Sequence, residues 1–396
     1  MSSSRRDYRG SAFLSCGFRP FFLFGSLFSG LSILLWLPQF YDRLDLASRF
    51  APLDWHIHEL YFGFLPAIIT GFLFTAVPNW TGRMPIRGTP LLLLLLVWIS
   101  GRLAVSFSSL LDWRVVMTVD VSFLALIVIV IANEIVAGKN WRNLKVLLPV
   151  VVLVAANIVF HLEARFDGVS DYSRRVAATA VVLLIMIIAG RVIPSFTRNW
   201  LSRENPGRLP VAFSRFDAVA ILVGLAAMTG WVIAPDANAT GVVMAIASAV
   251  HFVRLARWAG DRTLGDSLVF ILHVSYFYVP LGFALIAGAA MFGDTAPQLA
   301  GVHALGVGAA GGMTLSVMVR ASLGHTGRQL QAGMITKLLF MAVNCAAVAR
   351  ILAGLGLGPQ DMLIHVAGMC WMIAFVGFGL LFSRALLLPR SHPAGA

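Results

Sequence analysis

The chain has 396 residues, of which 59% are hydrophobic and only 12% are charged, with a mean hydropathy of +0.84. Soluble domains carry about 25% charged residues, so this composition excludes one large soluble core and indicates a polytopic membrane protein. The net charge of +12 does not indicate a nucleic-acid partner, because lysine and arginine gather on the cytoplasmic side of membrane proteins.

Apolar runs long enough to cross a bilayer as helices recur along the whole chain. These runs are continuous rather than alternating, so we expect an all-α transmembrane bundle rather than a barrel. The twelve expected spans are 19–38, 56–78, 89–108, 113–136, 144–162, 175–196, 213–234, 238–258, 266–290, 297–322, 333–355 and 360–387. The first run is too long for a signal peptide and is interpreted as an uncleaved span.

The spans form one transmembrane domain over 19–388, between an N-terminal segment 1–18 and a tail 389–396. The basic, turn-rich connection 197–212 can divide this domain into halves at 19–196 and 213–388. Of the 30 Lys and Arg residues, 22 lie at the termini and in loops from even to odd spans, and six lie in the opposite loops. This asymmetry predicts that both termini are cytoplasmic.

The second span begins with Asp54-Trp-His56-Ile-His58-Glu59. Asp54 is a plausible N-cap. Residues two apart on a helix point about 200° from each other, so His56 and His58 should have different partners unless the first turn is not helical. Glu59 shares a face with His56 and can orient a metal-bound imidazole or carry protons, or simply cap the helix start.

With this orientation, His56, His58, His161, His303 and His365 all lie within about 10 Å of the outer membrane boundary. Ionisable residues inside a membrane indicate function, although any one histidine can instead be hydrogen-bonded within the bundle. His56, His58, His303 and His365 are the candidate metal ligands, and His161 is a candidate supporting residue.

Arg102 and Arg350 lie in the same outer layer. A buried arginine needs an anion. Asp120 and Glu59 are candidate protein partners, and the alternative is a cofactor carboxylate such as a haem propionate.

Closer to the inner boundary, His251 and His273 share a depth on adjacent spans and can clamp one haem axially. His325 follows the tenth span at the inner surface and is a candidate supporting residue. Glycines at 306, 308, 311 and 312 allow either close helix packing or room for a flat macrocycle. No haem-attachment motif is present, so any haem would be a non-covalent haem b, and imidazoles also suit copper.

Several motifs resemble those of the NnrS family over nearly the whole chain. They are GFRPFF (17–22), WHIHE (55–59), GFLFTAVPNWTGR (71–83), GRVIPSFTRNWL (190–201), LHVSY (272–276), HALGVGAAGGMTLSVMVRASLGHTGR (303–328) and LLLPR (386–390). The resemblance implies a twelve-span protein of the bacterial inner membrane that contains haem and copper. It also implies a role in nitric oxide metabolism or resistance to nitrosative stress, often together with denitrification.

The sequence therefore leaves two candidate functions open. The first is a haem- and copper-binding protein that handles nitric oxide or nitrosyl species reaching it through the lipid bilayer, with an unidentified electron donor if it turns them over. The second is a secondary transporter that uses Arg102, Arg350, Asp120 and Glu59. The number of histidines in one layer favours the first function.

Overall fold

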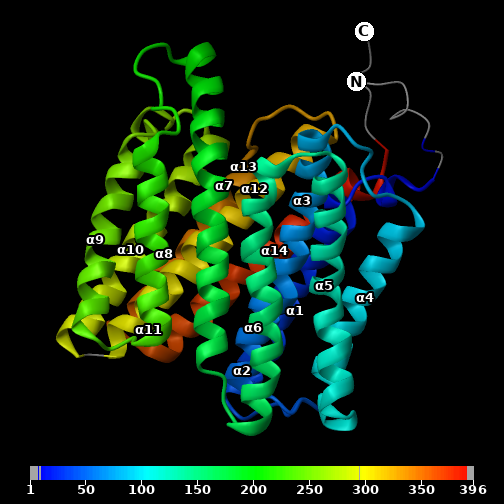
Figure 1. Ribbon diagram of the computed structural model, residues 1–396, viewed down its shortest axis with the longest axis vertical. Coiled ribbons are helices and arrows are strands. Elements are labelled where there is room, and N and C mark those ends of the chain that lie inside the picture. The colour runs from blue at the N-terminus through cyan, green and yellow to red at the C-terminus, as the bar shows by residue number, and fades with distance from the viewer. Residues whose placement is uncertain (1–7, 9, 294, 390–396) are drawn as a thin grey trace. The chain divides into compact units, whose positions relative to one another are not determined.

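The computed structural model describes residues 8, 10–293 and 295–389, which contain no strand (Figure 1). The prediction of an all-α fold is confirmed, and twelve helical segments within these ranges are long and apolar enough to cross a membrane. They are Phe18–Phe40, Pro52–Thr81, Thr89–Ser106, Trp113–Ala137, Trp141–Phe166, Tyr172–Glu204, Arg215–Ile233, Asn238–Arg262, Ser267–Phe292, Gln298–His325, Met334–Gly354 and Gln360–Leu387.

The chain divides into two compact units. Unit 1 combines the chain up to Ala177 with Val317–Leu330 and the chain from Phe375. Its helices are α1 (Phe18–Phe40), α2 (Pro52–His58), α3 (Leu65–Thr81), α4 (Thr89–Ser106), α5 (Trp113–Ala137) and α6 (Leu144–Phe166). Within it, α1 packs on α3, and α5 contacts α3, α4 and α6 (Figure 1).

Unit 2 contains Ala178–Ser316 and Gln331–Ala374. Its helices are α8 (Arg215–Ile233), α9 (Asn238–Ala256), α10 (Ser267–Phe292), α11 (Thr295–His303) and α13 (Met334–Gly354). Three helices contribute residues to both units, namely α7 (Tyr172–Glu204), α12 (Gly312–His325) and α14 (Gln360–Leu387). Within unit 2, α10 packs on α9 and α11, and α8 packs on α9. The division into halves at 19–196 and 213–388 stays a prediction.

The expected loop 197–212 is wrong in its first part, because α7 continues to Glu204. Thr197 and Leu201 are both fully buried, and residues four apart lie on one face of a helix. Burial of this face stabilises the extra turns even though the sequence there is polar and basic.

The expected N-cap is also wrong. Helix α2 begins at Pro52 after Ala51, and proline fits the first helical position because its fixed φ is already helical. The Asp54 carboxylate instead accepts hydrogen bonds from the backbone N–H and the hydroxyl of Ser170, at 3.1 and 2.6 Å. It thus ties the start of α2 to the connection between α6 and α7.

The surface of the spans carries large apolar side chains, whereas several of their charged residues are buried. Leu93 is 57% exposed, Leu222 64% and Met341 60%, whereas Asp120, Arg102 and Arg254 are at most 5% exposed. Apolar patches on this scale are rare on soluble monomers and match the hydrocarbon of a bilayer.

Candidate metal centre

Two π-helical segments interrupt the α-helical spans, and each follows a candidate histidine. Segment η3 (Glu59–Phe64) follows His58 and leads into α3, and segment η7 (Ala304–Gly311) follows His303 and leads into α12. Single π turns inside α-helices occur frequently at functional sites. In η3 the Gly63 carbonyl accepts a hydrogen bond from the Trp98 indole at 2.9 Å.

His56 and His58 have different partners, as the helix period predicts. The His56 ring stacks on Trp36 with 4.0 Å between the centroids. The His58 ring is fully buried, and its Nε2 lies 3.1 Å from Asp120 Oδ2 and 3.2 Å from Asn157 Oδ1. The structure therefore places His58 among other polar groups that ligate metals.

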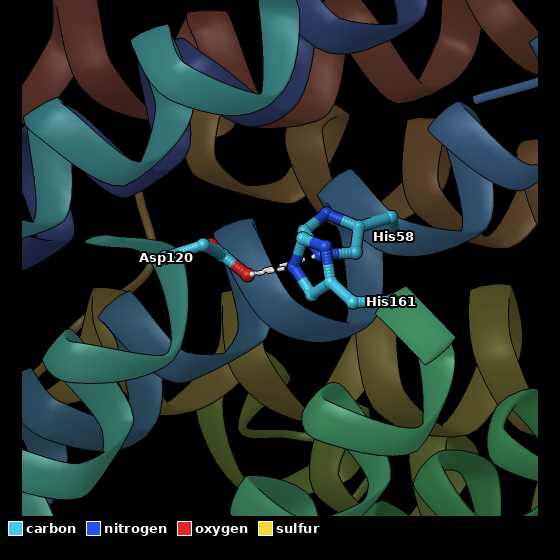
Figure 2. A group of neighbouring side chains, drawn as sticks. All are labelled: His58, Asp120 and His161. Atoms are coloured by element: carbon cyan, nitrogen blue, oxygen red, sulfur yellow. Dashed lines mark hydrogen bonds and ion pairs between the residues drawn. The ribbon is translucent and has the colours of Figure 1, made fainter. Parts of the chain in front are cut away.

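His58 belongs to a buried group that we call the Asp120 cluster. Its members are His58, Glu59, Arg102, Asp120, Asn157 and His161, and all belong to unit 1. Asp120 Oδ2 also lies 3.0 Å from His161 Nε2 and accepts a hydrogen bond from the Asn157 amide at 2.8 Å. Figure 2 shows both imidazoles directed at this one carboxylate.

The Arg102 guanidinium connects the two carboxylates of the cluster. It donates to Glu59 Oε2 at 2.6 Å and to Asp120 Oδ1. A Cβ at Gly63 would lie 2.6 Å from Arg102 Nη1, so glycine at this position leaves room for the ion pair. Arg102 thus has protein partners, which is the simpler of the two alternatives that the sequence offered.

The cluster has a net charge of −1 when both histidines are neutral, since Glu59 and Asp120 face one guanidinium. All these side chains are at most 5% exposed, and an uncompensated buried charge is costly. Neutrality requires one added positive charge, which can be a proton on a histidine or a monovalent metal ion.

The donor set fits a transition metal. Ligand atoms of His58, Asp120 and His161 lie within 4.8 Å of one another, and two imidazoles with a carboxylate suit copper, zinc or iron. Tetrahedral ligands at about 2.0 Å from an ion are ~3.3 Å apart, close to the 3.1 and 3.0 Å that separate the two Nε2 atoms from Asp120 Oδ2. An ion would replace the two hydrogen bonds to Asp120 Oδ2.

Glu59 lies on the Nδ1 side of the His58 ring, and its expected shared face with His56 stays a prediction. His58 Nδ1 lies 3.5 Å from Glu59 Oε1, and neither atom has a hydrogen bond within the described residues. A carboxylate behind an imidazole fixes its orientation and increases its basicity as a ligand. Glu59 is also the first residue of the π-helical segment η3.

Unit 2 holds the other candidate ligands of the outer layer. His303 Nδ1 lies 2.8 Å from the Leu299 carbonyl, and His365 Nδ1 lies 2.7 Å from the Asp361 carbonyl. An Nδ1–H donated to a carbonyl fixes the tautomer in which Nε2 carries the lone pair. Arg350 Nη2 lies 2.7 Å from His303 Nε2, so the guanidinium donates to this lone pair and a metal would have to displace it.

The inner histidines, His251 and His273, have other hydrogen-bond partners. His251 Nδ1 lies 2.8 Å from the Tyr276 hydroxyl, and its Nε2 lies 2.9 Å from the Ala220 carbonyl. His273 Nε2 lies 2.8 Å from Thr197 Oγ1. A haem bound through Nε2 of both rings would have to replace the contacts with the Ala220 carbonyl and Thr197.

His325 and the glycines of η7 and α12 have packing partners. The His325 ring lies 5.5 Å from the Phe18 ring. An added Cβ would meet the Tyr278 ring at 2.3 Å from Gly308, Trp371 at 2.5 Å from Gly311 and Ser275 at 2.6 Å from Gly312. These three glycines therefore serve close packing, the first of the two roles that the sequence allowed.

Two polar groups were not identified from the sequence. Asn157 lies one turn before His161 on α6, and this spacing of four residues could have revealed it. Arg254 is fully buried on α9 and donates to Asp217 at 3.1 Å and to Tyr276 at 2.8 Å. Arg254 lies near the end of the expected span 238–258, where an arginine is usually exposed, so the sequence did not predict its burial.

Comparison with known families gives one result that covers the chain. A family model described as NnrS protein matches residues 12–390. The search of curated proteins gives no match.

Proposed function

The chain belongs to the NnrS family, and from this premise we propose a haem- and copper-binding protein of the bacterial inner membrane. It acts in nitric oxide metabolism or in protection against nitrosative stress. The observation that carries the proposal is the convergence of His58, Asp120 and His161 in the buried interior of unit 1.

Copper is held by His58, His161 and Asp120 in this proposal. A cuprous ion supplies the single positive charge that the cluster requires, without protonation of either imidazole. The rings of Phe50, Phe62 and Phe160 lie between 5.1 and 5.2 Å from the His58 ring, so they exclude water from the ligands. Glu59 orients His58 from its Nδ1 side, and Arg102 pairs with both carboxylates.

Haem b is held in unit 2 through His303 or His365, because their Nδ1 contacts to backbone carbonyls fix the orientation of both rings. At His303 the haem would replace the Arg350 contact at Nε2. Arg350 is the candidate partner for a haem propionate, since an arginine binds carboxylates with two parallel hydrogen bonds. Arg102 is less suited to that role, because both carboxylates of the cluster already bind it. His251 and His273 remain the predicted inner pair, although their existing contacts support them less.

The bound groups would supply one-electron chemistry and an open position for a diatomic ligand. Nitric oxide is small and apolar and dissolves in the bilayer, so it can reach buried residues without a polar channel. The chain's own contribution is to bind and orient the metals and to exclude water from them.

The test is a metal and pigment analysis of protein purified from cells supplied with haem and copper. The wild type is expected to show a Soret band and bound copper by mass spectrometry. His161→Gln, which keeps a side chain of similar length, should lose copper and retain the Soret band. His303→Ala combined with His365→Ala should lose the Soret band and retain copper.

His325→Gln is the matched control, because this ring packs on Phe18, and it should change neither reading. Wild-type protein that contains neither haem nor copper would refute the proposal. Consumption of nitric oxide, followed with an electrode and a chemical reductant, then separates turnover from protective binding.

The transporter alternative has less support. Such proteins place substrate at discontinuous helices with unwound backbone. The segments Pro52–Thr81 and Gln298–His325 change from α to π geometry, but both stay helical throughout.

A further inference from the structure

A pocket at the end of α14 lies far along the chain from every candidate metal ligand of unit 1. It has a volume of about 380 Å³ and is lined by Arg328, Arg384, Thr326, Leu381, Leu388 and neighbouring residues of unit 1. This volume is within the range of about 300–1,000 Å³ typical of small-molecule sites.

The pocket is strongly basic and has no acidic neighbours in sequence. The segments 10–40, 317–330 and 375–389, which include its lining residues and α1, contain no Asp or Glu. Neither Arg328 nor Arg384 forms an ion pair with any residue that the structure describes. Both side chains are exposed, so their charges are available to an external anion.

Arg19 fixes the wall of the pocket. It is 5% exposed, and its Nη1 donates to the carbonyls of Leu386 and Leu388 at 3.1 and 2.7 Å. These carbonyls belong to the end of α14, where backbone acceptors lack helical partners. A third positive charge is therefore held directly behind the pocket residue Leu388.

The surface beside the arginines is apolar. Leu380 is 69% exposed and Leu387 is 45% exposed, and both lie on the last turns of the twelfth span. A site with arginines at the span end and exposed leucines along the span matches a phospholipid, with its phosphate at the boundary and its acyl chains against the helix.

We propose that this pocket binds the phosphate headgroup of an anionic phospholipid. The shared chemistry with free phosphate is the charged oxygens that the guanidiniums bind, but the exposed leucines favour the lipid. The positive-inside asymmetry predicts that this end of the twelfth span faces the cytoplasm, so the lipid would come from the inner leaflet.

The experiment measures lipid binding to the purified full-length protein by native mass spectrometry and thermal unfolding. Three additions are compared, namely phosphatidylglycerol, phosphatidylcholine and inorganic phosphate. We expect phosphatidylglycerol to remain bound and to raise the melting temperature more than the other two. Arg328→Gln with Arg384→Gln should weaken its binding about thirtyfold, since each interfacial charge contributes about 1 kcal/mol.

Arg142→Gln with Arg203→Gln is the matched control, because it removes two exposed charges that are also predicted to be cytoplasmic. Arg328→Lys with Arg384→Lys keeps the charge and should retain most of the binding, which tests the site even if the glutamine pair folds poorly. Equal loss in the control pair, unchanged binding in the glutamine pair, or equal stabilisation by inorganic phosphate would each overturn the proposal.

Discussion

Among the single residues of unit 1, Arg102 determines which charges the interior can hold. It is the arginine that pairs with both buried carboxylates of the Asp120 cluster. Removing one partner of a buried ion pair is strongly destabilising because it leaves an uncompensated charge. The effect of a substitution in this cluster therefore depends mainly on the charge that it leaves behind.

This argument ranks two substitutions. Arg102→Met leaves two buried carboxylates and should lower the free energy of unfolding by about 3–5 kcal/mol. Asp120→Asn leaves Glu59 paired with Arg102 and should cost only about 1–3 kcal/mol through weakened hydrogen bonds. Thermal unfolding of the purified variants measures the order, with Arg102→Met combined with Glu59→Gln expected to recover part of the loss. A larger loss for Asp120→Asn would contradict the charge argument.

At the scale of helices, close approach in unit 2 depends on the glycines of η7. Gly308 lies against the ring of Tyr278, and the Tyr278 hydroxyl donates to Asn344 Oδ1 at 3.1 Å. The Tyr278 ring is held at both ends. Its Cγ, the atom nearest to Gly308, is attached to the backbone through Cβ, and its hydroxyl is hydrogen-bonded to Asn344. The π-helical segment, α10 and α13 therefore meet at one inflexible contact.

Two glycine-to-alanine substitutions test this contact. Gly308→Ala should destabilise the protein by about 1–3 kcal/mol, because the new methyl group overpacks a ring that cannot move away. Gly288→Ala is the control on α10, where nothing lies within 4 Å of the added Cβ. It should stabilise by about 0.5–1 kcal/mol through helix propensity. Equal melting temperatures for the two variants would show that the packing at Gly308 is loose.

At the scale of the whole molecule, lysine and arginine are distributed unequally between the two sets of loops, and this asymmetry predicts the orientation. Alkaline phosphatase fused after Asp45 is expected to be active, because the connection from α1 to α2 is predicted to face the periplasm. The same enzyme fused after Gly207, between α7 and α8, should be inactive, and a fluorescent protein at the C-terminus should fluoresce. The opposite pattern at both sites would reverse the topology.

The spans could be predicted from the sequence, but several partners within the units could not. Runs of apolar residues identify helices because lipid requires internally satisfied backbone, and the observed helix ends agree within a few residues except at α7. Contacts between distant segments, such as His58 with Asp120 and Asn157, depend on which face each helix turns inward. A π-helical segment changes that face without a clear signal in composition, so the contact of Glu59 with His58 could not be predicted.

The buried net charge of the Asp120 cluster has an electrical consequence. His58 lies six residues into its span from Pro52, which is about 9 Å along a helix and near a third of a hydrocarbon core of about 30 Å. A cation that binds there from the predicted outer side would cross part of the transmembrane voltage. An elementary charge that crosses 100 mV gains about 2.3 kcal/mol, so an energised membrane would favour loading by about 0.7 kcal/mol, and collapse of the voltage would weaken it.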